Sequence, residues 1–100
     1  MTSLSTPGEA ARARTLHFLA HREQWPLWPF LPVVRRRPGR AEELGVVFDA
    51  LGCLGLAGFS STVFKTNLFL MPAKLDDFLA LPHETFDTPE EVLASGWTVD

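Results

Sequence analysis

Two histidines stand four residues apart, at His17 and His21. On a helix this spacing places both imidazoles on one face, where their nitrogens can ligate a metal ion. A stable site needs a third ligand, and the remaining histidine, His83, is remote in the sequence. Phe18 follows His17, so the chain has no HExxH motif. We therefore expect no metal site and no other cofactor.

A cluster of arginines offers a second kind of chemistry. It comprises Arg35, Arg36, Arg37 and Arg40. Basic side chains near aromatic ones can hold single-stranded nucleic acid through phosphate contacts and base stacking. Glu42 and Glu43 follow the cluster across a predicted turn, however, and the net charge of the chain is -3. We expect an ion-paired hairpin tip, with a nucleic-acid-binding module or a site for an acidic protein as the alternatives.

Acidic and nucleophilic residues suggest catalysis only weakly. The acids of the C-terminal half include Asp76, Asp77, Glu84, Asp87, Glu90 and Glu91. Paired carboxylates can serve acid–base chemistry, but Glu90 and Glu91 fall in the first turn of a predicted helix, where the helix dipole favours anions. No GxSxG motif surrounds Ser60 or Ser61. We predict no catalytic residues, and the sequence favours a non-enzymatic protein.

The lone cysteine, Cys53, excludes an intrachain disulfide. Its apolar neighbours predict a buried, inert thiol. Fifteen uncharged residues, 50–64, are too few to cross a bilayer and include three glycines. These features predict a soluble, cytoplasmic protein that does not enter a membrane.

Prolines recur at every third position in the segment 25–32, at Pro26, Pro29 and Pro32. A polyproline II helix has the same period, so Trp25 and Trp28 would share one edge of it. Two interpretations follow. The segment is a stiff connector that lays its tryptophan edge over the core, or it is a recognition strip with an exposed aromatic patch that includes Phe30.

The remaining pattern predicts the elements that position these residues. A flexible tail, 1–8, precedes a helix from Glu9 to Glu23. Strands are predicted at 31–36, 44–50 and 61–70, a Gly-rich loop or short helix at 51–60, helices at 73–80 and 89–95, and a further strand at 97–99. Thr88, Pro89 and Glu91 match a helix capping box, and Gly96 is a left-handed helix end.

This pattern predicts a single α+β domain over residues 9–100. An N-terminal helix packs on a three- to four-stranded antiparallel sheet, and two short C-terminal helices follow. The first helix is apolar on two sides and the predicted connector is aromatic, so apolar surface exceeds what a small sheet covers. We therefore expect a protein-interaction or accessory domain that binds a protein partner or associates with itself. The candidate binding residues are Trp25, Trp28, Phe30, Arg35, Arg36, Arg37 and Arg40.

Overall fold

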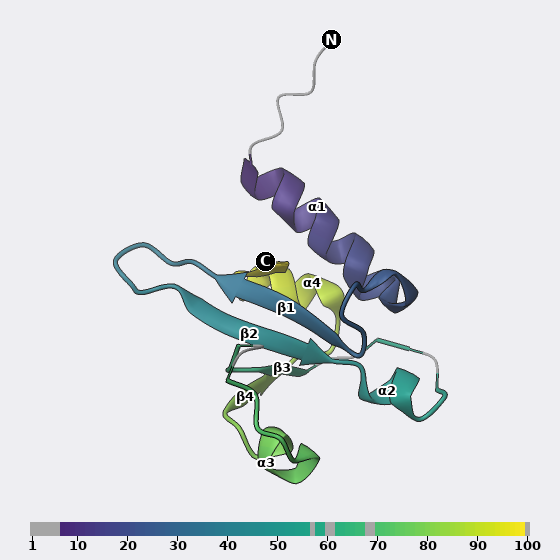
Figure 1. Cartoon of the computed structure of the whole chain (residues 1–100). Coiled ribbons are helices and arrows are strands. Elements are labelled where there is room, and N and C mark those ends of the chain that lie inside the picture. Colours follow the sequence, from purple (N-terminus) through teal and green to yellow (C-terminus); the bar gives the residue numbers. More distant parts are fainter. Residues whose placement is uncertain (1–6, 57, 60–61, 68–69, 100) are drawn as a thin grey trace.

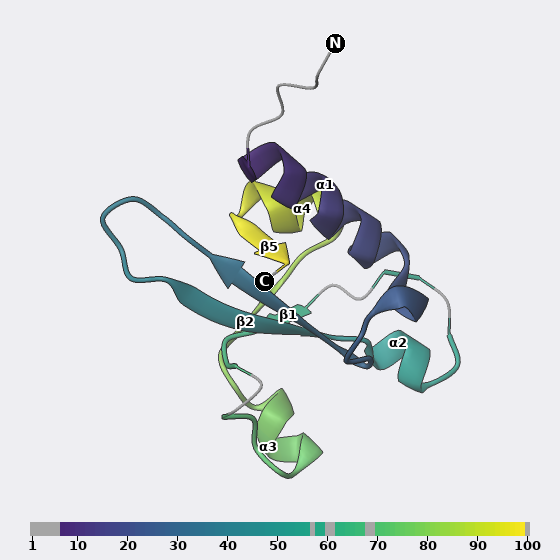
Figure 2. The ribbon, with the colours of Figure 1, turned by 45° about the horizontal axis from the view of Figure 1, so that its top comes forward.

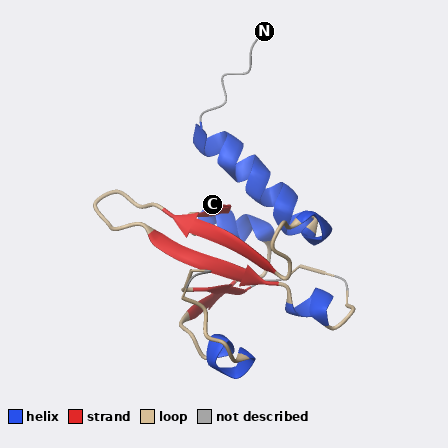
Figure 3. Cartoon of the chain, in the orientation of Figure 1, coloured by secondary structure: helices blue, strands red, loops and turns tan. Residues whose placement is uncertain are grey.

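A five-stranded antiparallel sheet organises the chain, in the order β4-β3-β2-β1-β5. The computed structural model describes residues 7–56, 58–59, 62–67 and 70–99. The strands are β1 (Phe30–Arg35), β2 (Glu43–Phe48), β3 (Thr62–Phe64), β4 (His83–Thr85) and β5 (Trp97–Val99). The helices are α1 (Pro7–Ala20), α2 (Ala50–Cys53), α3 (Leu75–Leu79) and α4 (Pro89–Ala94), with a short 3-10 helix at Arg22–Gln24. Figure 1 and Figure 3 show α1 and α4 on one side of the sheet and α3 on the other.

The predicted α+β fold is therefore confirmed, with one more strand than expected. The additional strand is β4, which pairs with β3 and places Glu84 opposite Val63. Its residues are too few and too polar to show an apolar alternation in the sequence. The first helix begins at Pro7, two residues inside the expected tail, and ends at Ala20, where the 3-10 turn follows.

The side of the sheet beneath α1 and α4 carries the main core, which includes Leu31, Val33, Val47, Val63 and Trp97. Trp97 is fully buried and lies over Gly45. A β-carbon at Gly45 would lie 3.0 Å from the Trp97 ring, so only glycine leaves room for the indole. The predicted N-cap is confirmed, because the Thr88 side chain accepts a hydrogen bond from the Glu91 backbone N–H. The Glu91 carboxylate accepts from the Asp87 N–H at 2.8 Å, one residue before the N–H that a capping box would use. Gly96 then adopts a φ of 95°, as expected of a left-handed helix end.

Helix α1 also covers the outer edge of β5, which lies beside β1 (Figure 2). The buried hydroxyl of Thr15 accepts a hydrogen bond from the Val99 N–H at 2.8 Å and donates to the Ala11 carbonyl at 2.7 Å. Arg14 donates to the Val99 carbonyl at 3.3 Å. Unpaired groups of an edge strand invite pairing with other chains, and these bonds satisfy both backbone groups of Val99.

An aromatic cluster occupies the opposite side of the sheet. Phe30, Phe48 and Phe64 project from three adjacent strands onto Phe78 of α3, with ring centroids 4.4–5.7 Å from the Phe78 ring. Strand β3 therefore serves two cores, since Val63 faces the first and Phe64 the second. Among the described residues of the strand predicted at 61–70, only Thr62–Phe64 form a strand. Phe30 is a structural member of this cluster and is only partly exposed.

Candidate interaction surface

The Trp-Pro segment folds as turns and does not form a polyproline helix. The Trp28 N–H donates to the Trp25 carbonyl at 3.3 Å, and the Phe30 N–H donates to the Leu27 carbonyl at 3.0 Å. A polyproline II helix has no internal hydrogen bonds, so the expectation of a shared tryptophan edge is wrong. The Trp28–Pro29 peptide is cis.

The two tryptophans of this segment have different environments. Trp25 is 5% exposed, and its Nε1–H donates to the Phe18 carbonyl at 2.6 Å. Trp28 is 48% exposed, yet its Nε1–H donates to Asp49 Oδ2 at 2.7 Å. The two tryptophans therefore differ in burial: Trp25 is part of the core, and about half of Trp28 is exposed.

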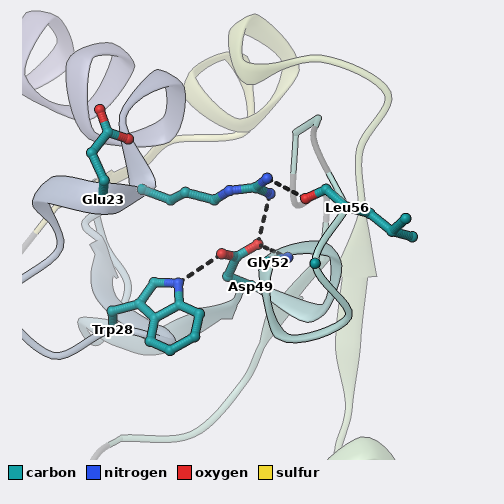
Figure 4. A pocket seen from close by; sticks show the side chains of 7 residues that line it. Glu23, Trp28, Asp49, Gly52 and Leu56 are labelled. Carbon is teal, nitrogen blue, oxygen red and sulfur yellow. Dashed lines mark hydrogen bonds and ion pairs between the residues drawn. The ribbon is translucent and has the colours of Figure 1, made fainter.

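The Asp49 carboxylate joins Trp28 to the chain that follows β2 (Figure 4). Asp49 is fully buried and accepts hydrogen bonds at Oδ1 from the Gly52 N–H and from Arg22 Nη1, both at 2.9 Å. Asp49 is therefore the N-cap of α2 and half of an ion pair at the same time. A β-carbon at Gly52 would lie 2.0 Å from Asp49 Oδ2, so the glycine is needed for this close approach.

Arg22 extends the same network to the loop beyond α2. Its Nη2 donates to the Leu56 carbonyl, and its Nη1 donates to the Gly58 carbonyl at 3.0 Å. The turn that carries Trp28 and the loop that carries Leu56 are consequently held by one carboxylate–guanidinium pair. Buried polar groups that are fully hydrogen-bonded restrict their surroundings to one arrangement.

An open hollow of about 510 Å³ lies between these two segments. It is lined by Arg22, Glu23, Trp28, Asp49, Gly52, Gly55 and Leu56. The same two segments also carry exposed large apolar side chains, namely Leu27, Trp28, Leu54 and Leu56, which we call the Trp28 surface. Large exposed apolar patches mark interaction sites, whereas apolar residues that are exposed singly are common on protein surfaces.

The predicted arginine cluster divides into buried and exposed members. Arg35 is 4% exposed, although it was a candidate surface residue. Its guanidinium lies 4.4 Å from the centre of the Trp97 ring. It also donates to Glu43 at 2.6 and 3.1 Å and to Glu84 at 2.8 and 3.1 Å. Arg35 is thus a buried residue, and its side chain connects β1 to the distant strand β4.

The other arginines lie at the exposed end of the β1–β2 hairpin. Arg36 pairs with Glu42 and Arg37 pairs with Glu43, both at 2.6 Å. Arg40 makes no ion pair among the residues that the structure describes. Carboxylates therefore engage three of the four arginines that a nucleic-acid site would use.

Hydrogen bonds and charges around Arg35 shift the pKa values of its partners. Hydrogen bonds from Arg35 and then Arg37 lower the pKa of Glu43 from 4.5 to about 2. Burial raises the pKa of Glu84, but the hydrogen bonds and positive charges of Arg35 and Lys65 together outweigh this effect, and the net pKa is lowered. The hydrogen bond to Glu43 raises the pKa of Arg35 itself, against the effect of burial. All three groups are therefore charged at neutral pH.

The histidines and the cysteine are the remaining candidates for chemistry. The rings of His17 and His21 stack with centroids 4.5 Å apart, and the described residues contain no group of three metal-ligating side chains. Cys53 is exposed, so the predicted burial of its thiol is wrong. The reason is that α2 is a single turn, and none of its residues is buried.

Comparisons of the chain with protein-family models, with curated proteins and with solved structures find no match. Among the described residues, no helix is long and apolar enough to cross a membrane.

Proposed function

We propose that this chain is a protein-interaction domain that binds a partner protein through the Trp28 surface. The observation that carries the proposal is that Trp28 is about half exposed and at the same time held by Asp49. Tryptophans are enriched among the residues that dominate binding energy at protein interfaces. Covering the exposed half of the indole would contribute about 2–3 kcal/mol to binding.

The hydrogen bonds of Asp49 add a second advantage for binding. Association costs free energy whenever a flexible side chain or loop must be ordered. The indole and the loop at Leu56 are ordered before binding, because the Asp49–Arg22 pair fixes both. A partner would therefore find a preformed surface. The arginine hairpin supports a nucleic-acid-binding function less well, because its charges are largely paired within the chain.

The test compares two exposed leucines, one in β2 and one in the loop after α2. Leu56 lies in the Trp28 surface, after the end of the strand, whereas Leu44 lies near its start, beside the hairpin tip. Leu56→Lys places a charge at the proposed interface, and Leu44→Lys is the matched control. Partner capture from lysate and sedimentation velocity are measured for both variants and for the unaltered chain.

We expect Leu56→Lys to weaken association at least tenfold, which corresponds to a loss of about 1.4 kcal/mol of binding free energy. Leu44→Lys should leave association unchanged. Formation of a homodimer with the same sensitivity would identify a second copy as the partner. The proposal fails if the chain is strictly monomeric and captures nothing. It also fails if capture is equally strong with Leu56→Lys.

A further inference from the structure

A second hollow lies on the other flank of α2. Its volume is about 300 Å³, and it is more enclosed than the hollow at Trp28. Its apolar walls are Phe48, Ala50, Leu51, Phe59, Phe64 and Leu79. Thr62 is the only polar residue among the lining residues that the structure describes. We call this hollow the Phe pocket.

The lining determines what kind of group can enter. An apolar wall offers no hydrogen bond to replace those that a polar or charged group would lose on leaving water. Three of the walls are phenylalanine rings, which favour edge-to-face or offset contacts with another ring. The volume is at the lower end of the range for ligand sites, and it suits a single ring.

The rim indicates that the ring belongs to a larger molecule. Leu79 is 43% exposed at the pocket, and Leu75, one helical turn earlier on α3, is also exposed. A free small molecule in the pocket would leave both leucines in water. A protein segment would cover them, because it brings its own surface along with the inserted side chain.

The charge beside the pocket further restricts that segment. Asp76 lies three residues before Leu79 on α3, so the two side chains are neighbours on the helix surface. Asp76 and Asp77 are exposed and make no ion pair among the described residues. Lys74 is the adjacent basic residue, and it leaves this end of α3 with a net negative charge. The segment 50–56 contributes no charge to the other side of the pocket.

We propose that the Phe pocket receives an aromatic side chain of the partner protein, followed by a lysine or arginine that lies beside Asp76. This inference depends on the proposed function, since it names the chemistry of the same partner at a neighbouring surface. Helix α2 separates the two hollows, with Gly52 lining one and Leu51 the other. A partner that packs on Trp28 could therefore reach across α2 into the Phe pocket.

The experiment uses the full chain and two capped dipeptides, N-acetyl-Phe-Lys-amide and N-acetyl-Phe-Glu-amide. Binding is followed through the methyl NMR signals of Ala50, Leu51 and Leu79. We expect saturable shifts with a Kd in the millimolar range, on the order of that of a fragment with few contacts. The Phe-Lys probe should bind roughly two- to fivefold more tightly than the Phe-Glu probe, the effect of one exposed ion pair. Asp76→Asn should abolish this difference.

Two substitutions at exposed alanines form a test and its control. Ala50→Phe places a ring at the pocket and should weaken Phe-Lys binding at least tenfold, whereas Ala41→Phe, on the hairpin, should not affect it. Unchanged amide spectra away from α2 verify that both variants fold. The proposal is overturned if neither dipeptide shifts the methyl signals, if Phe-Glu binds as well as Phe-Lys, or if toluene binds while the dipeptides do not.

The outcomes also separate this inference from the proposed function. Probe binding without any partner capture would contradict the proposed function and leave the pocket as a ring-binding site. Partner capture that is sensitive to Leu56→Lys but indifferent to Ala50→Phe would contradict the pocket inference alone.

Discussion

Replacement of Arg35 by methionine tests the buried charge cluster most directly. Methionine keeps much of the aliphatic stem but removes the guanidinium that lies between Glu43, Glu84 and the Trp97 ring. Removing one partner of a buried ion pair costs about 3–5 kcal/mol. Here the two carboxylates are partly exposed and retain Arg37 and Lys65 as partners. We therefore expect a loss of about 3 kcal/mol in the free energy of unfolding at pH 7, at the lower end of that range.

The effect should also depend on pH, in a direction that the pKa values define. Arg35 and Arg37 lower the pKa of Glu43 in the folded chain to about 2, from an ordinary value of 4.5. A carboxylate with a lowered folded pKa stabilises the fold above its unfolded pKa, and this stabilisation is lost as the pH falls through the folded pKa. The lowered pKa of Glu84 acts in the same direction. The difference between the unaltered chain and Arg35→Met should therefore shrink as the pH falls from 4.5 to about 2.

Urea unfolding followed by tryptophan fluorescence, at pH 7 and at acidic pH, measures both effects. Arg36→Met is the control, because the Arg36–Glu42 pair is exposed and such pairs contribute at most about 1 kcal/mol. The reasoning is refuted if Arg35→Met and Arg36→Met are equally stable at pH 7. It is also refuted if the Arg35→Met deficit persists undiminished once both glutamates are protonated.

Three further substitutions probe other close contacts. Gly45→Ala should lower the free energy of unfolding by about 1–3 kcal/mol, because its β-carbon would lie 2.8 Å from Val63 Cγ1 and 3.0 Å from the Trp97 ring. Thermal unfolding of Gly45→Ala, Val63→Ala and the double variant tests this contact. The double variant should lose less stability than the two single variants lose together. Thr15→Val should cost about 1–3 kcal/mol and accelerate hydrogen exchange at Val99, whose N–H loses its acceptor; unchanged exchange there would contradict the edge-capping role. Asp49→Asn should lower the free energy of unfolding by about 2 kcal/mol, since a single amide oxygen cannot replace both carboxylate oxygens. Iodide quenching of tryptophan fluorescence should show a more mobile Trp28. Unaltered quenching would show that Asp49 does not hold the indole.

The sequence predicts the elements well where local chemistry is strong. Thr88 and Gly96 define α4 because capping and a left-handed helix end depend on neighbouring residues alone. The β1–β2 hairpin is equally local, since Pro38 and Gly39 define its turn and Gly39 has a φ of 72°. Strand β4 could not be predicted, because its three polar residues acquire a strand conformation only through pairing with β3.

The candidate site was only partly predictable, and the arginines show why. A run of Arg35, Arg36 and Arg37 is uniform in the sequence, whereas strand geometry turns successive side chains to opposite faces. Arg35 becomes buried because Glu84, 49 residues away in the chain, and the Trp97 ring lie on the same face. No local pattern in the sequence predicts that Arg35, Glu84 and Trp97 meet. A basic cluster is therefore weak evidence for a nucleic-acid surface until its acidic partners have been placed.

The burial of Trp25 and the exposure of Trp28 were equally hard to predict from the local sequence. Each precedes a proline, and both fall in one proline-rich segment, so the local sequence does not show which of them is buried. Each indole N–H donates to a different acceptor. Trp25 donates to the Phe18 carbonyl in the core, whereas Trp28 donates to the Asp49 carboxylate near the surface. If Trp28 served only to fill the core, a buried carboxylate would be a costly way to hold it. The same carboxylate also caps α2 and pairs with Arg22, so the exposed half of the ring is the part that the proposed interface would cover.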